Sequence, residues 1–277
     1  VFGSHRNSKG KLILKCDRQT LPIAAIREEN SSLRTFTFHS KLKAEPGQFI
    51  MLTIFSQGEK PFSILDVDEK SFSMTIKNMG PFTDRLFQMK VGELVSVRGP
   101  YGQSFNRQSG SILMVGGGFA TPPLRFLAKK LREDGVTRLV NINGARSAED
   151  LLYVDDFEIL CHQSHIATDD GSLGHKGTSV DVMEKVLQDE SFDQIYISGP
   201  EKMMKAAVAV AKKHQLPYEV NLERYMKCGV GVCGSCVMDP TGFILCMEGP
   251  IVDNRTLDSL EDFGTAHRGK TGRKTAL

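Results

Sequence analysis

SILMVGGGFATPPLRFLAKKLRED, residues 111–134, places an apolar run before three glycines and a helical pattern after them. The uncharged run predicts a buried strand. The apolar residues that follow the glycines repeat at the spacing of one helix face: Leu124, Leu127, Ala128 and Leu131. A strand that passes through glycines into a helix is typical of α/β proteins, so we predict an α/β domain around this stretch.

The same alternation continues toward the end of the chain. Apolar runs predict further strands at 138–146, 157–163 and 194–200. Helical periodicity covers 179–190 and 201–215. Strands that alternate with helices predict a parallel sheet of the nucleotide-binding kind.

Toward the start of the chain the pattern is different. Residues 20–105 contain short alternating runs broken by Pro and Gly, at 33–40, 47–55, 71–79 and 92–102. Short strands at this spacing predict a small β-barrel. A chain of 277 residues therefore suits two modest domains better than one compact domain.

Composition excludes some classes of function. The net charge is +2, from 35 basic and 33 acidic residues, which argues against a nucleic-acid binder. No apolar run approaches the ~20 residues that cross a bilayer, and the polar start VFGSHRNSKG lacks the core of a signal peptide. We expect a cytoplasmic protein with a flexible extension at 1–19, no membrane contact and a mobile end, GKTGRKTAL.

Four of the six cysteines lie within nineteen positions, spaced C-x4-C-x2-C-x9-C: Cys228, Cys233, Cys236 and Cys246. The first intervals match the plant-type [2Fe–2S] spacing, and the interspersed glycines allow the tight curvature that wrapping a cluster needs. The last cysteine follows a predicted hairpin turn, DPTGF. Structural zinc is the alternative, although zinc sites more often use two C-x2-C pairs. A disulfide scaffold would spread its cysteines along a short chain.

Two further segments contain candidate phosphate ligands. VGGGFATPPL, residues 115–124, would let backbone amides approach a phosphate at a helix N-terminus, but an ordinary tight turn explains it equally well. KPFSI at 60–64 and GPFT at 80–83 combine a cation, a hydroxyl and a glycine-led turn. Taken alone, a surface lysine, a core phenylalanine and a helix cap explain them better. Turn-rich loops at 167–177 and 197–204 favour a nucleotide site, because ligands bind at the carboxyl ends of parallel strands.

The order of these motifs resembles the ferredoxin–NADP reductase superfamily with an added iron–sulfur segment. TDDGSLGHKG and ERYMKCGVGVCGSC, with CMEGP, are most similar to the electron-transfer subunits of B-type dihydroorotate dehydrogenases. The resemblance covers about residues 20 to 265. It implies a β-barrel FAD-binding domain at 20–106, an α/β NAD-binding domain at 107–222, a [2Fe–2S] segment at 223–265 and a tail at 266–277.

The resemblance also implies site residues. FAD would be bound by Lys60, Pro61, Phe62, Ser63, Thr75, Ile76, Lys77, Gly80, Phe82 and Thr83. NAD, as co-substrate, would be bound by Gly116, Gly117, Gly118, Asp170 and Gly199. The four cysteines would ligate the cluster. Lys60 replaces the arginine that is usual in this family, so the bidentate hydrogen bonding of a guanidinium to phosphate is lost. Ser198 stands where many reductases carry cysteine.

By this resemblance, electrons from dihydroorotate pass from the FMN of a catalytic partner subunit through the cluster and FAD to NAD⁺, in pyrimidine biosynthesis. The partner would complete a heterotetramer. No acid–base side chain is required here, so we expect ordinary roles for His162, His165 and His175. One alternative is a reductase subunit of a soluble hydrogenase or sulfite reductase, and another is a zinc-stabilised module without redox activity. Arg146 leaves NAD and NADP equally open, because it could meet a 2′-phosphate or pair with a nearby carboxylate.

Overall fold

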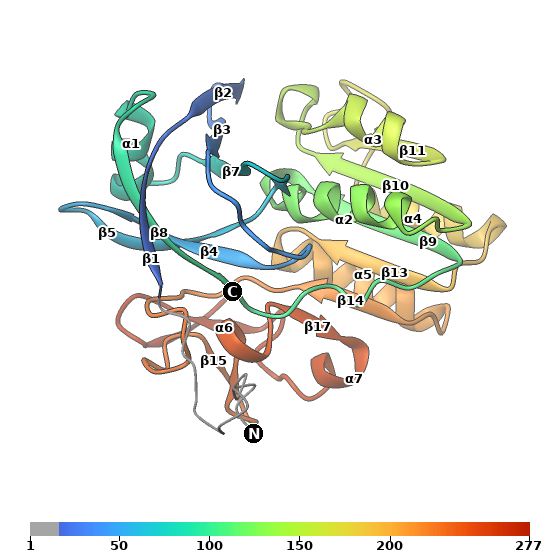
Figure 1. Ribbon diagram of the computed structural model, residues 1–277. Coiled ribbons are helices and arrows are strands. Elements are labelled where there is room, and N and C mark those ends of the chain that lie inside the picture. The colour runs from blue at the N-terminus through green and yellow to red at the C-terminus, as the bar shows by residue number, and fades with distance from the viewer. Residues whose placement is uncertain (1–16) are drawn as a thin grey trace, which may run out of the picture.

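A computed structural model describes residues 17–277 and shows a barrel, an α/β domain and a smaller segment packed beneath both (Figure 1). Most of the expected flexible extension, residues 1–16, lies outside the described residues. The predicted fold class is confirmed. None of the helices in residues 17–277 combines the length and the apolar character that crossing a bilayer requires.

The barrel consists of two four-stranded antiparallel sheets, ordered β1-β8-β4-β5 and β2-β3-β7-β6. Their strands are β1 (Arg18–Pro22), β2 (Ala25–Asn30), β3 (Leu33–Phe38), β4 (Phe49–Ile54), β5 (Gly58–Ser63), β6 (Asp66–Val67), β7 (Phe72–Lys77) and β8 (Leu94–Tyr101). Strict alternation along β7 buries Phe72, Met74 and Ile76 in the barrel core. One helix, α1 (Pro81–Gln88), leads from β7 toward β8.

The α/β domain is built on a seven-stranded sheet ordered β12-β11-β10-β9-β13-β14-β17. Its strands are β9 (Ser111–Gly117), β10 (Arg138–Ala145), β11 (Gln163–Thr168), β12 (His175–Lys176), β13 (Gln194–Ser198), β14 (Tyr218–Asn221) and β17 (Ile251–Asp253). Its helices are α2 (Pro122–Glu133), α3 (Val154–Leu160), α4 (Ser179–Asp189) and α5 (Glu201–Lys213). Alternate residues of β9 pack on opposite faces of the sheet: Ile112 and Met114 against α2, Leu113 and Val115 against the side of α4 and α5.

The strand predicted at 157–163 is wrong. This stretch contains helix α3, and the strand β11 begins only at Gln163. Phe157 and Cys161 lie four residues apart and are both buried, which is helical spacing. Asp155 and Asp156 in the first turn favour a helix N-terminus. A short apolar run cannot separate the two structures by periodicity alone.

The last segment contributes to the sheet and to its own hairpins. Strands β15 (Val237–Met238) and β16 (Phe243–Ile244) pair antiparallel around the predicted DPTGF turn. After α6 (Leu245–Glu248), strand β17 pairs antiparallel with β14, and α7 (Asn254–Leu257) follows. The segment that carries the cysteines is therefore joined to the α/β sheet through β17.

Residues 266–277 were expected to be a tail with a mobile end at 269–277, but they contain an antiparallel pair, β18 (Ala266–Arg268) and β19 (Lys274–Ala276). Arg268 pairs with Asp239 at 2.7 Å, and Lys274 pairs with Asp239 at 3.0 Å and also with Asp262. The basic residues of this segment, which were expected to be solvated, thus form ion pairs with carboxylates next to the cysteine segment. We call residues 266–277 the terminal hairpin.

Candidate redox cofactor site

Two adjoining cavities open where the barrel, the α/β domain and the last segment meet. The first has a volume of about 260 Å³ and the second about 810 Å³. They share lining residues that include Pro61, Phe62 and Thr83, so they can accept one elongated ligand. All ten residues that the sequence assigned to FAD line one cavity or the other.

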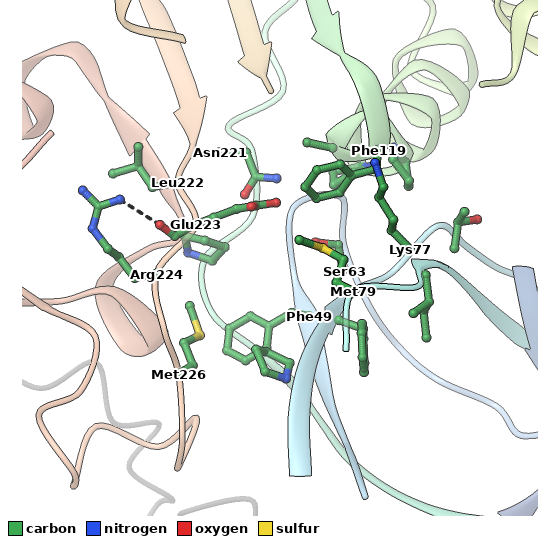
Figure 2. A pocket seen from close by; sticks show the side chains of 18 of the residues that line it. Phe49, Ser63, Lys77, Met79, Phe119, Asn221, Leu222, Glu223, Arg224 and Met226 are labelled. Atoms are coloured by element: carbon green, nitrogen blue, oxygen red, sulfur yellow. Dashed lines mark hydrogen bonds between the residues drawn. The ribbon is translucent and has the colours of Figure 1, made fainter. Parts of the chain in front are cut away.

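The first cavity has mostly apolar walls (Figure 2). Ser63 and Lys77 come from the ends of β5 and β7, and Phe119 faces them from the α/β domain. The Lys77 ammonium lies 5.3 Å from the centre of the Phe119 ring. Flat apolar walls with a few polar groups suit an aromatic ring system such as the flavin ring.

The second cavity contains the groups that suit phosphates. Gly80 precedes α1 at φ 153°, a conformation that favours glycine, and its amide donates to Thr83 Oγ1 at 3.0 Å. Thr83 therefore shapes the turn, and the N-terminus of α1 faces the cavity with its favourable field. Lys60 donates to the hydroxyl of Tyr225 at 3.2 Å and lies 4.7 Å from the ring centre. Its ammonium is thereby held on the cavity wall.

The glycine loops of the α/β domain meet at the switch point of the sheet, between β9 and β13. A Cβ on Gly199 would lie 3.4 Å from Gly117 Cα, an ordinary contact, and 2.4 Å from Met203 Sδ, so a larger residue would require the Met203 side chain to move. Gly118 adopts φ 55°, also a conformation that favours glycine. Gly116, Gly117, Gly118 and Gly199 therefore form one backbone-lined site at the carboxyl ends of these strands.

Asp170 does not join these glycines. It follows β11, at the far side of the sheet from β13, and accepts hydrogen bonds from the amide and hydroxyl of Ser172 at 2.9 and 2.6 Å. Within residues 17–277 it lies outside the lining of both cavities, as do His162, His165 and His175. His162 Nδ1 instead accepts from the Leu139 amide at 2.9 Å.

The four cysteines gather around one loop in which backbone amides point at sulfur. The amides of Val230 and Val232 donate to Cys228 Sγ at 3.5 and 3.4 Å, and the Gly231 amide donates to Cys246 Sγ at 3.3 Å. The described cysteines are all free thiols. Amides aimed at sulfur and four available thiols are the donor set that an iron–sulfur cluster requires.

The thiols are arranged as two pairs, Cys228 with Cys233 and Cys236 with Cys246. Burial acts to raise the pKa of Cys233, but hydrogen bonds from Ser235 and Cys228 outweigh it and lower this pKa to about 6. Two pairs of thiols match the two irons of a [2Fe–2S] cluster.

The cysteine loop is anchored on the barrel. The buried Arg98 guanidinium on β8 donates to the Cys228 carbonyl at 2.6 Å and to Glu59 Oε1 at 2.9 Å. A Cβ on Gly229 would lie 2.9 Å from Met51 Cγ and 3.7 Å from Phe49 Cε2. Since Phe49 also lines the first cavity, the cysteine loop and the proposed flavin ring site are separated by little more than this side chain.

Two apolar residues near the cysteines have different surroundings. Met226 is buried and lines both cavities, whereas Val232 is 77% exposed. Met226 packs within the chain, and Val232 is free to meet a partner.

Sequence reasoning missed Asn221, the last residue of β14, and the three residues that follow it. Asn221, Leu222, Glu223 and Arg224 line the first cavity from the side opposite the barrel (Figure 2). The rule that parallel strands present ligands at their carboxyl ends would have found them, had β14 been predicted. The strand was overlooked because it contains only four residues.

Comparisons with known proteins agree with this geometry. Three family models match in order: an oxidoreductase FAD-binding domain at 21–105, an oxidoreductase NAD-binding domain at 114–209, and the iron–sulfur cluster binding domain of dihydroorotate dehydrogenase B at 223–258. The site therefore takes FAD, NAD and an iron–sulfur cluster.

Similar proteins cover nearly the whole chain. Probable electron transfer subunits of dihydroorotate dehydrogenase B (NAD(+)) from Methanocaldococcus jannaschii and Methanothermobacter thermautotrophicus are each 38% identical. The alignments cover 91% and 92% of this chain and 96% of each relative. A solved structure of NADH-dependent reduced ferredoxin-NADP oxidoreductase is 30% identical with a TM-score of 0.78, covering 88% of this chain and 93% of that one.

Proposed function

Because this chain belongs to the electron transfer subunits of dihydroorotate dehydrogenase B, we propose that it carries electrons released from dihydroorotate to NAD⁺. It is an oxidoreductase subunit that works with a catalytic partner subunit. When bound, FAD exchanges electron pairs with nicotinamide and single electrons with the iron–sulfur cluster, which is chemistry that side chains do not supply.

One observation carries this proposal: three segments of the chain meet at the first cavity. The barrel contributes Ser63 and Lys77, and the α/β domain contributes Phe119. The cysteine loop packs on Phe49 from behind. A flavin ring held there would have the nicotinamide site on one side and the cluster on the other, as an electron relay requires.

The chain's own residues position the groups and keep water away. Lys60 and the turn before α1 would bind the phosphates of FAD. The glycines at the β9–β13 switch point would let the backbone approach NAD. Cys228 and Cys233 would hold one iron of a [2Fe–2S] cluster, and Cys236 and Cys246 the other.

For the partner we propose the FMN-containing catalytic subunit, in a heterotetramer with two copies of each chain. The exposed Val232 lies between Cys228 and Cys233 and would contact that subunit. A cluster that receives electrons from another subunit must lie close to the shared surface, and Cys233 is itself exposed.

The test is a cysteine substitution in the intact complex. Purified without oxygen, the chain should contain one flavin and about two irons. Cys233→Ser should lose the cluster absorbance and dihydroorotate-driven NAD⁺ reduction, while NADH still bleaches the flavin. Cys161→Ser is the control, because Cys161 is buried within the α/β domain, away from the loop. Undiminished dihydroorotate-driven NAD⁺ reduction by Cys233→Ser, or a colourless zinc protein, would refute the relay.

A second candidate keeps the cofactors and changes the partner. The likeness to a ferredoxin-NADP oxidoreductase favours a reductase that serves another iron–sulfur protein, such as a soluble hydrogenase or sulfite reductase. The two candidates are separated by the electron donor that reduces NAD⁺ or NADP⁺. Reduction of NAD⁺ by dihydroorotate in the presence of the catalytic subunit would support the first candidate. Reduction by a reduced iron–sulfur protein, with none by dihydroorotate, would support the second.

A further inference from the structure

The terminal hairpin forms one wall of the second cavity. His267, Arg268, Gly269 and Leu277 line it together with Lys60 and Gly80. We infer that the terminal hairpin is part of the cofactor site and binds the adenosine monophosphate half of FAD. This inference rests on the proposed FAD site of the barrel and adds residues to it.

The lining of this wall has unused hydrogen-bonding capacity. His267 Nδ1 and Arg268 Nε are buried and have no hydrogen-bond partner among residues 17–277. A buried polar atom without a partner is costly, so these two atoms are available to a ligand that enters the cavity. FAD could supply the missing partners. Its phosphate oxygens, adenine nitrogens and ribose hydroxyls can all accept hydrogen bonds from His267 and Arg268.

The charges around the second cavity suit an anion. Of the two carboxylates in its lining, Glu201 is paired with Arg224 through two contacts of 2.7 and 2.8 Å. The other, Glu223, has its pKa raised by burial and by the charge of Glu201, which favours its neutral form. Lys60 and Arg268 therefore line a cavity whose own acidic side chains carry little unpaired negative charge, and Arg268 also pairs with Asp239 outside this lining.

The position of the terminal hairpin indicates which half of FAD it would contact. In the described chain its residues line only the second cavity, whereas Ser63 and Lys77 line only the first. FMN has a flavin ring and one phosphate, which the barrel residues can hold without the hairpin. The hairpin therefore contacts what FAD has and FMN lacks, so it should select FAD over FMN.

The hairpin is also held firmly enough to act as a wall. Arg268 and Lys274 both pair with Asp239, which lies next to β15 in the cysteine segment. The Asp239 amide donates to Asp262 at 2.8 Å, and Asp262 also pairs with Lys274. These contacts join the hairpin to the cysteine segment, so occupation of the FAD site and order in this segment should support each other.

The experiment compares two flavins on the full chain after reversible removal of its flavin. The dissociation constants of FAD and FMN are measured by fluorescence titration for the parent, Arg268→Ala and Arg273→Ala. Arg273 is the matched control, because it lies in the same hairpin, is exposed and lines neither cavity in the described chain. Arg268→Ala should weaken FAD about tenfold or more, the expected cost of losing a hydrogen bond to a charged group. FMN affinity should stay within about twofold of the parent, and Arg273→Ala should match the parent with both flavins.

Equal effects of Arg268→Ala on FAD and FMN, or none on either, would overturn the inference. If this variant also loses cluster absorbance through its contact with Asp239, then His267→Ala decides by the same two affinities, since that ring makes no ion pair to the cysteine segment. A parent chain that binds neither flavin would contradict the proposed function itself. If the parent binds FAD, and Arg268→Ala and His267→Ala bind it with the same affinity as the parent, only the role of the hairpin would be contradicted.

Discussion

At the scale of single residues, the burial of the Glu219 carboxyl group should make the free energy of unfolding depend on pH. It lies on β14, is 9% exposed and accepts a hydrogen bond from the Asn106 amide at 3.0 Å. Burial raises its pKa to about 7; the Asn106 hydrogen bond opposes this shift, and the charge of Asp253, its neighbour on β17, adds to it. The carboxyl group therefore keeps its proton in the folded chain at a pH where the unfolded chain has lost it.

The sign of the pH effect follows from proton binding. Between pH 4.5 and about 7 the folded state binds more protons at Glu219 than the unfolded state, so the free energy of unfolding falls as pH rises. The loss reaches about 3 kcal/mol above this window. Glu219→Gln removes this pH-dependent loss, because glutamine does not ionise, and the glutamine amide oxygen can still accept the hydrogen bond from the Asn106 amide. We expect the Tm of this variant to exceed that of the parent at pH 7.5 and to match it near pH 5. A Tm difference that is the same at both pH values would contradict this account.

At the scale of elements, strands β5 and β8 hold the cysteine loop in place. Arg98 on β8 is 9% exposed and bridges Glu59 on β5 and the Cys228 carbonyl. Burial tends to raise the pKa of Glu59, but hydrogen bonds from Arg98 and Thr53 outweigh it and lower this pKa. A buried pair of this kind is costly to break on one side, because the remaining charge has no partner.

We therefore expect Arg98→Ala to loosen the cluster. Its iron content should fall, and bleaching by an iron chelator should be at least several times faster than in the parent. The matched control is Arg18→Ala: Arg18 pairs with the same Glu59 at 3.0 Å, is half exposed and makes no contact with the cysteine loop among the described hydrogen bonds. Equal bleaching rates in Arg98→Ala and Arg18→Ala would show that the loop does not depend on β8.

Elements also show what the sequence could and could not predict. Long patterned segments such as β9, α2 and α5 were predicted, because burial on one face imposes a period that the residues must follow. The barrel residues that the sequence assigned to FAD all line one of the two cavities, and their contact with FAD stays a prediction. The terminal hairpin was not predicted, because Arg268 and Lys274 are held by carboxylates far away in sequence. The distance of Asp170 from the glycines could not be predicted, because strand order is a tertiary property, and its role toward NAD stays a prediction.

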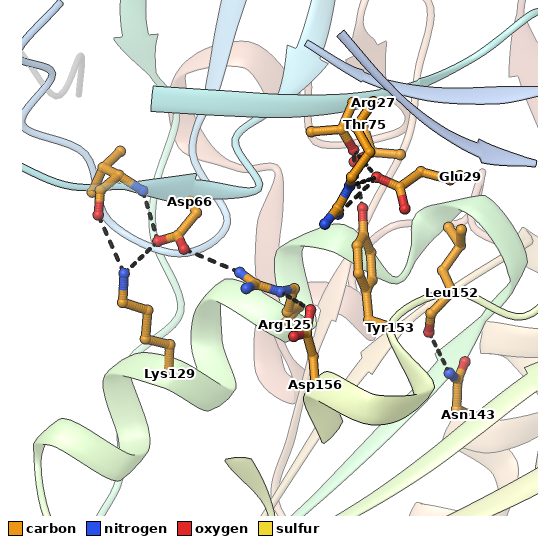
Figure 3. A network of polar contacts seen from close by, with 12 residues as sticks. Arg27, Glu29, Asp66, Thr75, Arg125, Lys129, Asn143, Leu152, Tyr153 and Asp156 are labelled. Carbon is orange, nitrogen blue, oxygen red and sulfur yellow. Dashed lines mark hydrogen bonds and ion pairs between the residues drawn. The ribbon is translucent and has the colours of Figure 1, made fainter. Parts of the chain in front are cut away.

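At the scale of the whole molecule, a polar network joins the barrel to the α/β domain (Figure 3). Tyr153 of the α/β domain bonds Thr75, which bonds Thr35 at 2.6 Å within the barrel. Asp66 of the barrel accepts from Arg125 at 3.1 Å and from Lys129 at 2.7 Å on α2. Thr75 also lines the first cavity, so this network adjoins the proposed flavin ring site.

The network should set the angle between the two domains and therefore the rate of hydride transfer. Domain interfaces within a chain are often mobile, and a misplacement of about 1 Å between reacting groups can cost about a hundredfold in rate. Asp66→Ala removes both contacts to α2, and Tyr153→Phe removes the hydroxyl that bonds Thr75. We expect the double variant to reduce its flavin at saturating NADH about ten times more slowly than the parent, with each single variant between them.

Stopped-flow bleaching of the flavin measures this rate, and the affinities for FAD and NADH should stay near those of the parent because neither Asp66 nor Tyr153 lines a cavity in the described chain. Lys130→Ala is the control, since its ion pair with Glu133 at 2.6 Å stays within α2. A double variant as fast as Lys130→Ala would mean that packing alone holds the domains at the working angle. A slower rate with weakened NADH binding would instead assign the network to the nicotinamide site, because the reacting geometry and the binding affinity would then have changed together.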